Sequence, residues 1–171
     1  MDFRTFLSLP SSLKQINLVR DEIIQNPICF FDVFQLIFEK DYKHAWRAAW
    51  AIEKVSEKDA SFFSENEIIQ LMTFSQHIKN SSLLRSVLSI LINLPIPKNL
   101  PVEFINLCFD NMISMKEPVA VQALSIKMLH RISEIEPDFI PEIIATLENI
   151  DTSCCSAGYI AMRTQVLRSL Y

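Results

Sequence analysis

The sequence predicts an all-α protein built from repeated pairs of helices, and three observations support this prediction. The 171 residues contain one glycine, Gly158, which leaves little of the conformational freedom that tight β-hairpins need. Valine and isoleucine recur at intervals of three and four residues, which is the spacing of one helix face rather than of a strand. The same apolar spacing returns about every 38 residues.

The first predicted helix covers residues 13–26 and follows an arm that contains Phe3 and Phe6. Ser11 or Ser12 can cap its start, and Pro27 ends it because proline has no backbone N–H to donate. Its apolar face has the spacing of a helix, with Leu13, Ile16, Val19, Ile23 and Ile24.

The second predicted helix covers residues 28–40, with Pro27 in a favourable position at its start. It is apolar on more than one side, so we expect neighbours on both sides of it. The residues responsible are Phe30, Phe31, Phe34, Leu36, Ile37 and Phe38.

Seven further helices bring the prediction to about nine. Ser64 and Glu67 have capping-box spacing, Pro95 and Pro97 stop a helix, and Pro118 suits the first turn of another. The predicted ranges are 42–55, 64–78, 83–94, 102–115, 118–133, 139–150 and 157–170.

The second helix of each pair carries the repeat. Counted from the helix end, the positions 0, −3 and −4 are apolar in all four copies, which places them on one helix face. Position 0 is Val55, Leu94, Ile132 and Leu170, at intervals of 39, 38 and 38 residues. Positions −6 and −7 are mostly apolar in the first three copies and become Thr164 and Arg163 in the fourth. The fourth copy therefore suits the outermost unit of a stack.

The run Trp46-Arg47-Ala48-Ala49-Trp50-Ala51-Ile52-Glu53 resembles the second helix of HEAT/armadillo-type repeats, which contains Arg-Ala-Ala. The resemblance covers about residues 28–171. It implies a right-handed α-α superhelix whose second helices line a concave face and hold a macromolecular partner, and it carries no catalytic residue with it. We expect a single domain over residues 1–171, with a capping arm and helix at 1–27, repeat pairs at 28–157 and a capping helix at 158–171.

The surface presented by the second helices is predicted to be basic. Residues 46–55, 85–94, 123–132 and 161–170 contain seven Lys or Arg and one carboxylate, Glu53, although the whole chain has 16 bases and 20 acids. This strip is a candidate site for an acidic peptide or a phosphate backbone. The candidate partner-binding residues are Arg47, Trp50, Lys54, Arg85, Lys127 and Arg131.

Two other interpretations of the strip stay open. Cations favour helix C-termini, by about 0.3–1 kcal/mol each, and this accounts for Lys54, Arg131 and Arg168 without a ligand. Trp46 and Trp50 lie four residues apart among alanines, a pattern more typical of packing between repeats than of a stacking platform for a base.

No enzyme is predicted, because no nucleophile and base or pair of facing carboxylates can be recognised. No cofactor is expected either, since one glycine excludes phosphate-cradling loops. The histidines His44, His77 and His130 share no ligand spacing, so no metal site is expected.

We therefore expect a scaffold that binds a protein or peptide, and three alternatives stay open. The chain could bind nucleic acid, which the net charge of −4 disfavours, or act as a HEAT-like DNA glycosylase with Glu53 as its carboxylate. It could also self-associate through Phe3, Phe6 and the Phe30 to Phe38 segment. Its oligomeric state is not predicted.

The expected location is the cytoplasm, without a membrane span. An acid follows Met1, the first apolar run is too short for a signal peptide, and no stretch approaches the roughly 20 apolar residues of a spanning helix. The cysteines Cys29, Cys108, Cys154 and Cys155 lack the two-residue spacing of metal or redox motifs, so we expect them reduced and mostly buried.

Overall fold

The computed structural model describes residues 2–9 and 12–171, and over these ranges it contains ten α-helices, four short 3-10 helices and no strand. The all-α prediction is confirmed. The chain divides into two compact units, residues 1–95 and residues 96–171, and the prediction of a single domain stays a prediction.

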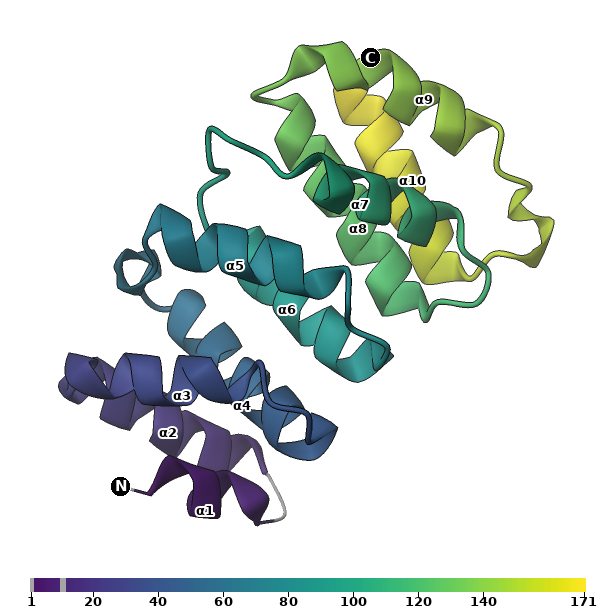
Figure 1. Cartoon of the computed structure of the whole chain (residues 1–171). Coiled ribbons are helices and arrows are strands. Elements are labelled where there is room, and N and C mark those ends of the chain that lie inside the picture. The colour runs from purple at the N-terminus through teal and green to yellow at the C-terminus, as the bar shows by residue number, and fades with distance from the viewer. Residues whose placement is uncertain (1, 10–11) are drawn as a thin grey trace. The chain divides into compact units, whose positions relative to one another are not determined.

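The first unit consists of stacked helix pairs. The second helices α2, α4 and α6 pack side by side, while α3 packs on α4 and α5 on α6 (Figure 1). The short helix α1 packs on both α3 and α4. The elements are α1 (Phe3–Ser8), α2 (Leu13–Gln25), η1 (Pro27–Cys29), α3 (Phe30–Leu36), α4 (Tyr42–Ser56), η2 (Ala60–Phe62), α5 (Glu65–Ser75) and α6 (Ser81–Asn93).

The second unit repeats this arrangement with two pairs. Helix α8 packs on α7 and on α10, and α9 packs on both α8 and α10. The elements are α7 (Val102–Ile113), α8 (Val119–Ser133), η3 (Pro137–Phe139), α9 (Ile140–Glu148), η4 (Thr152–Cys154) and α10 (Ala157–Leu170).

Helix α1, in the N-terminal arm, is the one α-helix of the described ranges that the sequence did not predict. Asp2 caps α1 by accepting a hydrogen bond from the backbone N–H of Thr5, and its carboxylate also accepts one from the Thr5 hydroxyl. Phe3 and Leu7, one turn apart, are both buried. A helix this short is marginal by itself, so its tertiary contacts hold it.

The helix predicted over residues 28–40 is shorter than expected. Pro27 starts the 3-10 helix η1, α3 begins only at Phe30, and the α-helix ends at Leu36, before Phe38. Phe31 is 53% exposed, so α3 is not covered on every side.

Most of the predicted helix starts are confirmed. Ser12 forms a capping box with Gln15, and Ser64 forms one with Glu67. Pro118 takes the N-cap position of α8 rather than its first turn. Ser11 lies outside the described residues.

The repeat phase is confirmed by burial. Every residue at positions 0, −3 and −4 of the first three copies is at most 1% exposed. In the fourth copy Val166 is buried, whereas Leu167 and Leu170 are only partly covered. The buried set is Val55, Ile52, Ala51, Leu94, Leu91, Ile90, Ile132, Leu129 and Met128.

Aromatic rings form much of the core of the first unit. Phe30 is 2% exposed, and its ring centroid lies 5.1–5.6 Å from those of four other phenylalanines. Aromatic pairs at this separation stabilise beyond the effect of their buried area. Phe30 therefore links α3 to the next helix pair, through Phe62 of η2 and through Phe63, which follows η2.

Candidate partner-binding surfaces

Arg47, on α4, is engaged within its own unit. Its Nη1 donates hydrogen bonds to the backbone oxygens of Leu7 at 2.8 Å and Ser8 at 2.9 Å. These carbonyls belong to the last turn of α1, where helix oxygens lack intrahelical partners. The predicted binding residue thus closes the C-terminal end of the N-terminal helix.

Trp50 stacks on Trp46 along the same helix. Their ring centroids are 5.7 Å apart and their planes differ by 17°. Nε1 of Trp46 is buried and has no hydrogen-bond partner among the described residues. The stacked pair agrees with the packing interpretation of the two tryptophans.

Lys54 also has an internal partner. Lys54 lies in the last turn of α4, and its Nζ is 2.6 Å from Oε1 of Glu57, the C-cap residue of that helix. This position agrees with the preference of cations for helix C-termini.

Arg85, on α6, lies near Glu53 of α4. Burial raises the pKa of Glu53, and the charges of Lys54 and Arg85 offset part of that effect. Oε2 of Glu53 and the Ser86 hydroxyl are both buried without a hydrogen bond of normal geometry to any described residue. The lone carboxylate of the strip is therefore a partly desolvated acid.

In the second unit, Lys127 lies in a pocket between α8 and α10. The pocket has a volume of about 270 Å³ and is lined by Lys127 and His130 from α8 and by Met162, Gln165, Val166 and Ser169 from α10. Lys127 is exposed, and no residue of the described ranges pairs with it. An adjoining hollow shares Gln165 and Ser169 and includes Arg168.

Ser169 of α10 makes one hydrogen bond within its own helix and one to His130 of α8. The Ser169 hydroxyl donates to the backbone oxygen of Val166 at 2.7 Å, and it lies 2.9 Å from Nε2 of His130. The histidine tautomer determines which of the two groups donates in the contact between Ser169 and His130.

The remaining cations of α8 and α10 differ in their surroundings. Arg163 donates from Nε to the backbone oxygen of Leu147 at 2.6 Å and so ties α10 to α9. Burial lowers the pKa of Arg131, and the nearby Glu134 opposes this shift. Arg168 is exposed in the last turn of α10.

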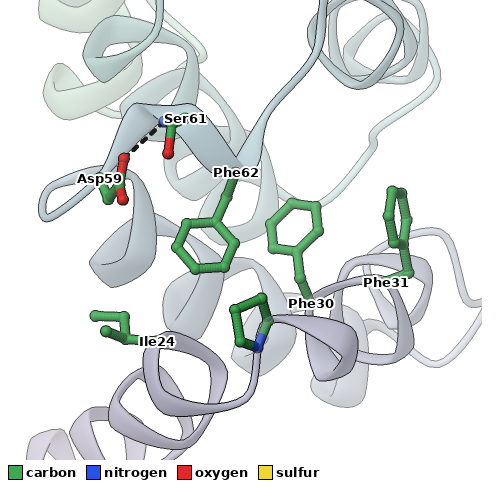
Figure 2. Close-up of a pocket in the computed structure, with 7 residues that line it drawn as sticks. Ile24, Phe30, Phe31, Asp59, Ser61 and Phe62 are labelled. Carbon is green, nitrogen blue, oxygen red and sulfur yellow. Dashed lines mark hydrogen bonds between the residues drawn. The ribbon is translucent and has the colours of Figure 1, made fainter.

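An apolar groove in the first unit includes Phe30 and Phe31 of the segment proposed for self-association, and none of the six candidate partner-binding residues lines it. Figure 2 shows Phe30 of α3 and Phe62 of η2 facing one another, with Ile24 at one end. The groove has a volume of about 450 Å³. Its other lining residues are Pro27, Phe31, Asp59 and Ser61.

The six predicted partner-binding residues therefore differ in their surroundings. Arg47 and Lys54 are tied to their own unit, Trp50 stacks on Trp46, and Lys127 faces a pocket. Gln165 was missed, although it occupies position −5 of the fourth copy, as Lys127 does in the third. The role of all six in binding a partner stays a prediction.

Further features bear on the kind of site the chain could hold. Within the described ranges there is no group of three or more His, Cys, Asp or Glu that could hold a metal ion, and no helix is long and apolar enough to cross a membrane.

Of the described cysteine side chains only Cys108 is buried; Cys29 and Cys155 are partly exposed, so the prediction of mostly buried cysteines was wrong. The side chain of Cys154 lies outside the described residues.

Helix pairs in register, a buried face at fixed repeat positions and polar side chains presented by the second helices define an α-helical repeat protein. The family model of the HEAT repeat domain matches residues 3–170, and the chain belongs to this family. HEAT repeats are in general protein-interaction scaffolds, and the family is typically non-enzymatic. Comparison with curated proteins and with solved structures finds no match.

Proposed function

We propose that the chain is a non-enzymatic scaffold that binds an acidic peptide segment of a protein partner on the surface of α8 and α10. The observation that carries this proposal is charge segregation. Helices α8 and α10 together carry Lys127, Arg131, Arg163 and Arg168 and no Asp or Glu. In a chain with net charge −4, such a surface is locally opposite in sign to the whole protein.

The pocket between α8 and α10 is the proposed position for an acidic side chain of the partner. Lys127 and Arg168 are exposed, and the amide of Gln165 can donate to the same ligand. An acidic side chain entering beside Lys127 would meet a cation with no competing internal carboxylate among the described residues. Pairs of this kind contribute more to specificity and association rate than to affinity.

A peptide is favoured over a nucleic acid because of the overall charge. A phosphate backbone extends well beyond one pocket and would encounter the acidic remainder of the chain, whereas a short acidic segment can stay within α8 and α10. The glycosylase alternative needs a carboxylate facing a bound base, and the partly buried Glu53 belongs to the other unit.

The proposal is tested by titrating the full chain into a labelled peptide rich in Asp and Glu and following fluorescence anisotropy. We expect binding that weakens as salt rises, and about a tenfold loss of affinity in Lys127→Glu/Arg168→Glu. The matched control is Lys14→Glu/Lys58→Glu, which reverses two exposed cations of the first unit and keeps the same net charge.

Equal binding by the two double variants would overturn the proposed site, because only the total charge would then matter. A duplex DNA oligonucleotide serves as the second probe. Tighter binding to the DNA than to the peptide, lost in the Lys127→Glu/Arg168→Glu variant, would replace peptide binding by nucleic-acid binding.

A further inference from the structure

The apolar groove of the first unit presents bulky side chains that the core does not use. Phe31 is 53% exposed and Ile24 is 38% exposed, and both line the groove. Ile28, on the η1 segment between Pro27 and Phe30, is 87% exposed. Exposed apolar side chains gathered in this way are typical of interaction sites.

The groove has few polar side chains, namely those of Asp59 and Ser61. Oδ1 of Asp59 accepts a hydrogen bond from the backbone N–H of Ser61 at 2.8 Å, and this bond caps η2 (Figure 2). Sites for small molecules instead combine an apolar wall with several convergent polar groups that orient the ligand. An occupant held by bulky apolar side chains suits this groove better.

The charge around the groove selects among such occupants. Residues 21–39 carry four carboxylates and no Lys, Arg or His, and residues 57–67 carry four carboxylates and one lysine, Lys58. Three of these carboxylates, Asp21, Glu39 and Glu57, are paired with Arg or Lys. The other five make no ion pair with a described residue: Glu22, Asp32, Asp59, Glu65 and Glu67.

One of the unpaired carboxylates lines the groove, and another is the sequence neighbour of a lining residue. Asp59 lines it, and Asp32 follows Phe31 directly in α3. Both are exposed, so they set the sign of the local field without being buried by the core.

We propose that this groove docks a short peptide segment of a partner protein that combines bulky apolar side chains with Lys or Arg. The apolar side chains would fill the space beside Phe30, Phe31 and Phe62, and the cations would lie near Asp59 and Asp32. The site goes beyond the acidic-peptide site on α8 and α10, because it lies in the other unit and takes a ligand of opposite charge.

The test uses the full chain and two labelled synthetic peptides of equal length, one with Leu and Lys at helical spacing and one with Leu and Glu in the same pattern. We expect the Leu/Lys peptide to bind by fluorescence anisotropy and the Leu/Glu peptide not to bind. Phe31→Ser should weaken the Leu/Lys complex about tenfold, because it removes an exposed apolar anchor. Asp32→Lys should weaken it to a similar extent by reversing a charge that no described residue pairs with.

Matched controls lie in the second unit. Ile135 is also 53% exposed, and Glu136 is an exposed carboxylate beside it, so Ile135→Ser removes a bulky apolar side chain and Glu136→Lys reverses a charge away from the groove. Both variants should bind the Leu/Lys peptide as the unmodified chain does. Circular dichroism melting checks that Phe31→Ser is folded, and the exposed Asp32→Lys variant tests the groove without touching an aromatic ring.

Three results would overturn the proposal. The first is no binding of the Leu/Lys peptide. The second is equal weakening by Asp32→Lys and Glu136→Lys, which would show attraction to the net charge alone. The third is a concentration-dependent dimer in sedimentation velocity that Phe31→Ser abolishes and the peptide does not displace, because the occupant would then be a second copy of the chain.

Discussion

Nη1 of Arg47 lies 2.8 Å from the backbone oxygen of Leu7, which is 40 residues earlier in the chain, and 2.9 Å from that of Ser8. The guanidinium thus satisfies two carbonyls at the end of α1 that the helix itself leaves unpaired. A second contact, between Arg4 and Glu39, joins α1 to the residues that follow α3. The N-terminal helix is therefore held by its buried apolar side chains, by Arg47 of α4 and by the ion pair between Arg4 and Glu39.

Replacing Arg47 by Ala should release α1. Hydrogen bonds to a charged group are worth about 1.5–3 kcal/mol each, and we expect a loss of about 1–2 kcal/mol in the free energy of unfolding because Arg47 is partly solvated. Hydrogen exchange of residues 3–9 should speed up more than exchange in α6. Arg168→Ala is the control, since Arg168 is exposed in the other unit, and unchanged exchange in residues 3–9 would contradict the role of Arg47.

Replacing Phe30 by Ala should destabilise the first unit severely. Phe30 is 2% exposed and contacts four other aromatic rings, and removing a buried phenylalanine costs about 3–5 kcal/mol. Phe31→Ala, next to it but half-exposed, should cost about 1 kcal/mol or less. Urea unfolding of both variants measures the difference, and equal losses would contradict the central place of Phe30 in the cluster.

Replacing Glu53 by Gln should stabilise the protein at neutral pH. Burial raises the pKa of Glu53 above its ordinary value of 4.5, so the folded state holds its proton more strongly than the unfolded state. Below pH 4.5 both states are protonated and the side chain has no differential effect. As the pH rises through the folded-state pKa, the carboxylate becomes charged in a partly dry site, and this contribution to stability is lost.

The stability of Glu53→Gln should therefore match that of the unmodified chain in acid and exceed it at pH 7. Thermal melts over this pH range provide the measurement. Glu65→Gln, an exposed carboxylate at the start of α5, is the control. A variant that is less stable at pH 7 than in acid, relative to the unmodified chain, would contradict desolvation as the dominant effect.

Replacing Tyr159 by Phe should cost about 1 kcal/mol at neutral pH and should reduce unfolding in alkali. The Tyr159 hydroxyl donates to the buried backbone oxygen of Met112 at 3.0 Å, and its loss leaves that oxygen without its donor. Burial raises the pKa of Tyr159 to about 12 from 10.0. Between these values the unfolded phenol ionises while the folded one stays neutral, so stability falls with rising pH.

The Tyr159→Phe variant should lack this part of the fall between pH 10 and 12. Chemical denaturation across the range compares it with Tyr42→Phe, which changes an exposed tyrosine. Identical alkaline slopes for the unmodified chain and the Tyr159→Phe variant would count against a neutral, buried phenol.

Local patterns were sufficient to predict most helices. The predicted helix 157–170 agrees with α10 at both ends, and Ser64 and Glu67 form the capping box that their spacing indicates. These features depend on residues three or four apart, whose geometry within a helix is nearly invariant. The helix over Phe3–Ser8 was missed because six residues cannot form a stable helix without the contacts to α3 and α4.

The surroundings of the candidate site residues could not be predicted from the same local patterns. Lys127 and Arg47 both looked like presented cations, yet Lys127 faces a pocket and Arg47 binds the carbonyls of α1. The difference depends on which element folds back against each helix, and no spacing along the chain encodes it. The groove beside Phe62 joins side chains from α2, α3 and η2, which are up to 38 residues apart.

The sequence by itself determined the helical class, the repeat phase and the buried positions of the second helices. Those properties follow from helix periodicity and from the burial that an apolar face requires. Only the tertiary structure decided that Arg47 binds the end of α1, that His130 of α8 lies beside Ser169 of α10, and that Phe31 stays exposed in a groove. Each of these depends on long-range packing, which determines whether a polar or aromatic side chain meets a partner within the fold or is left to meet one from outside it.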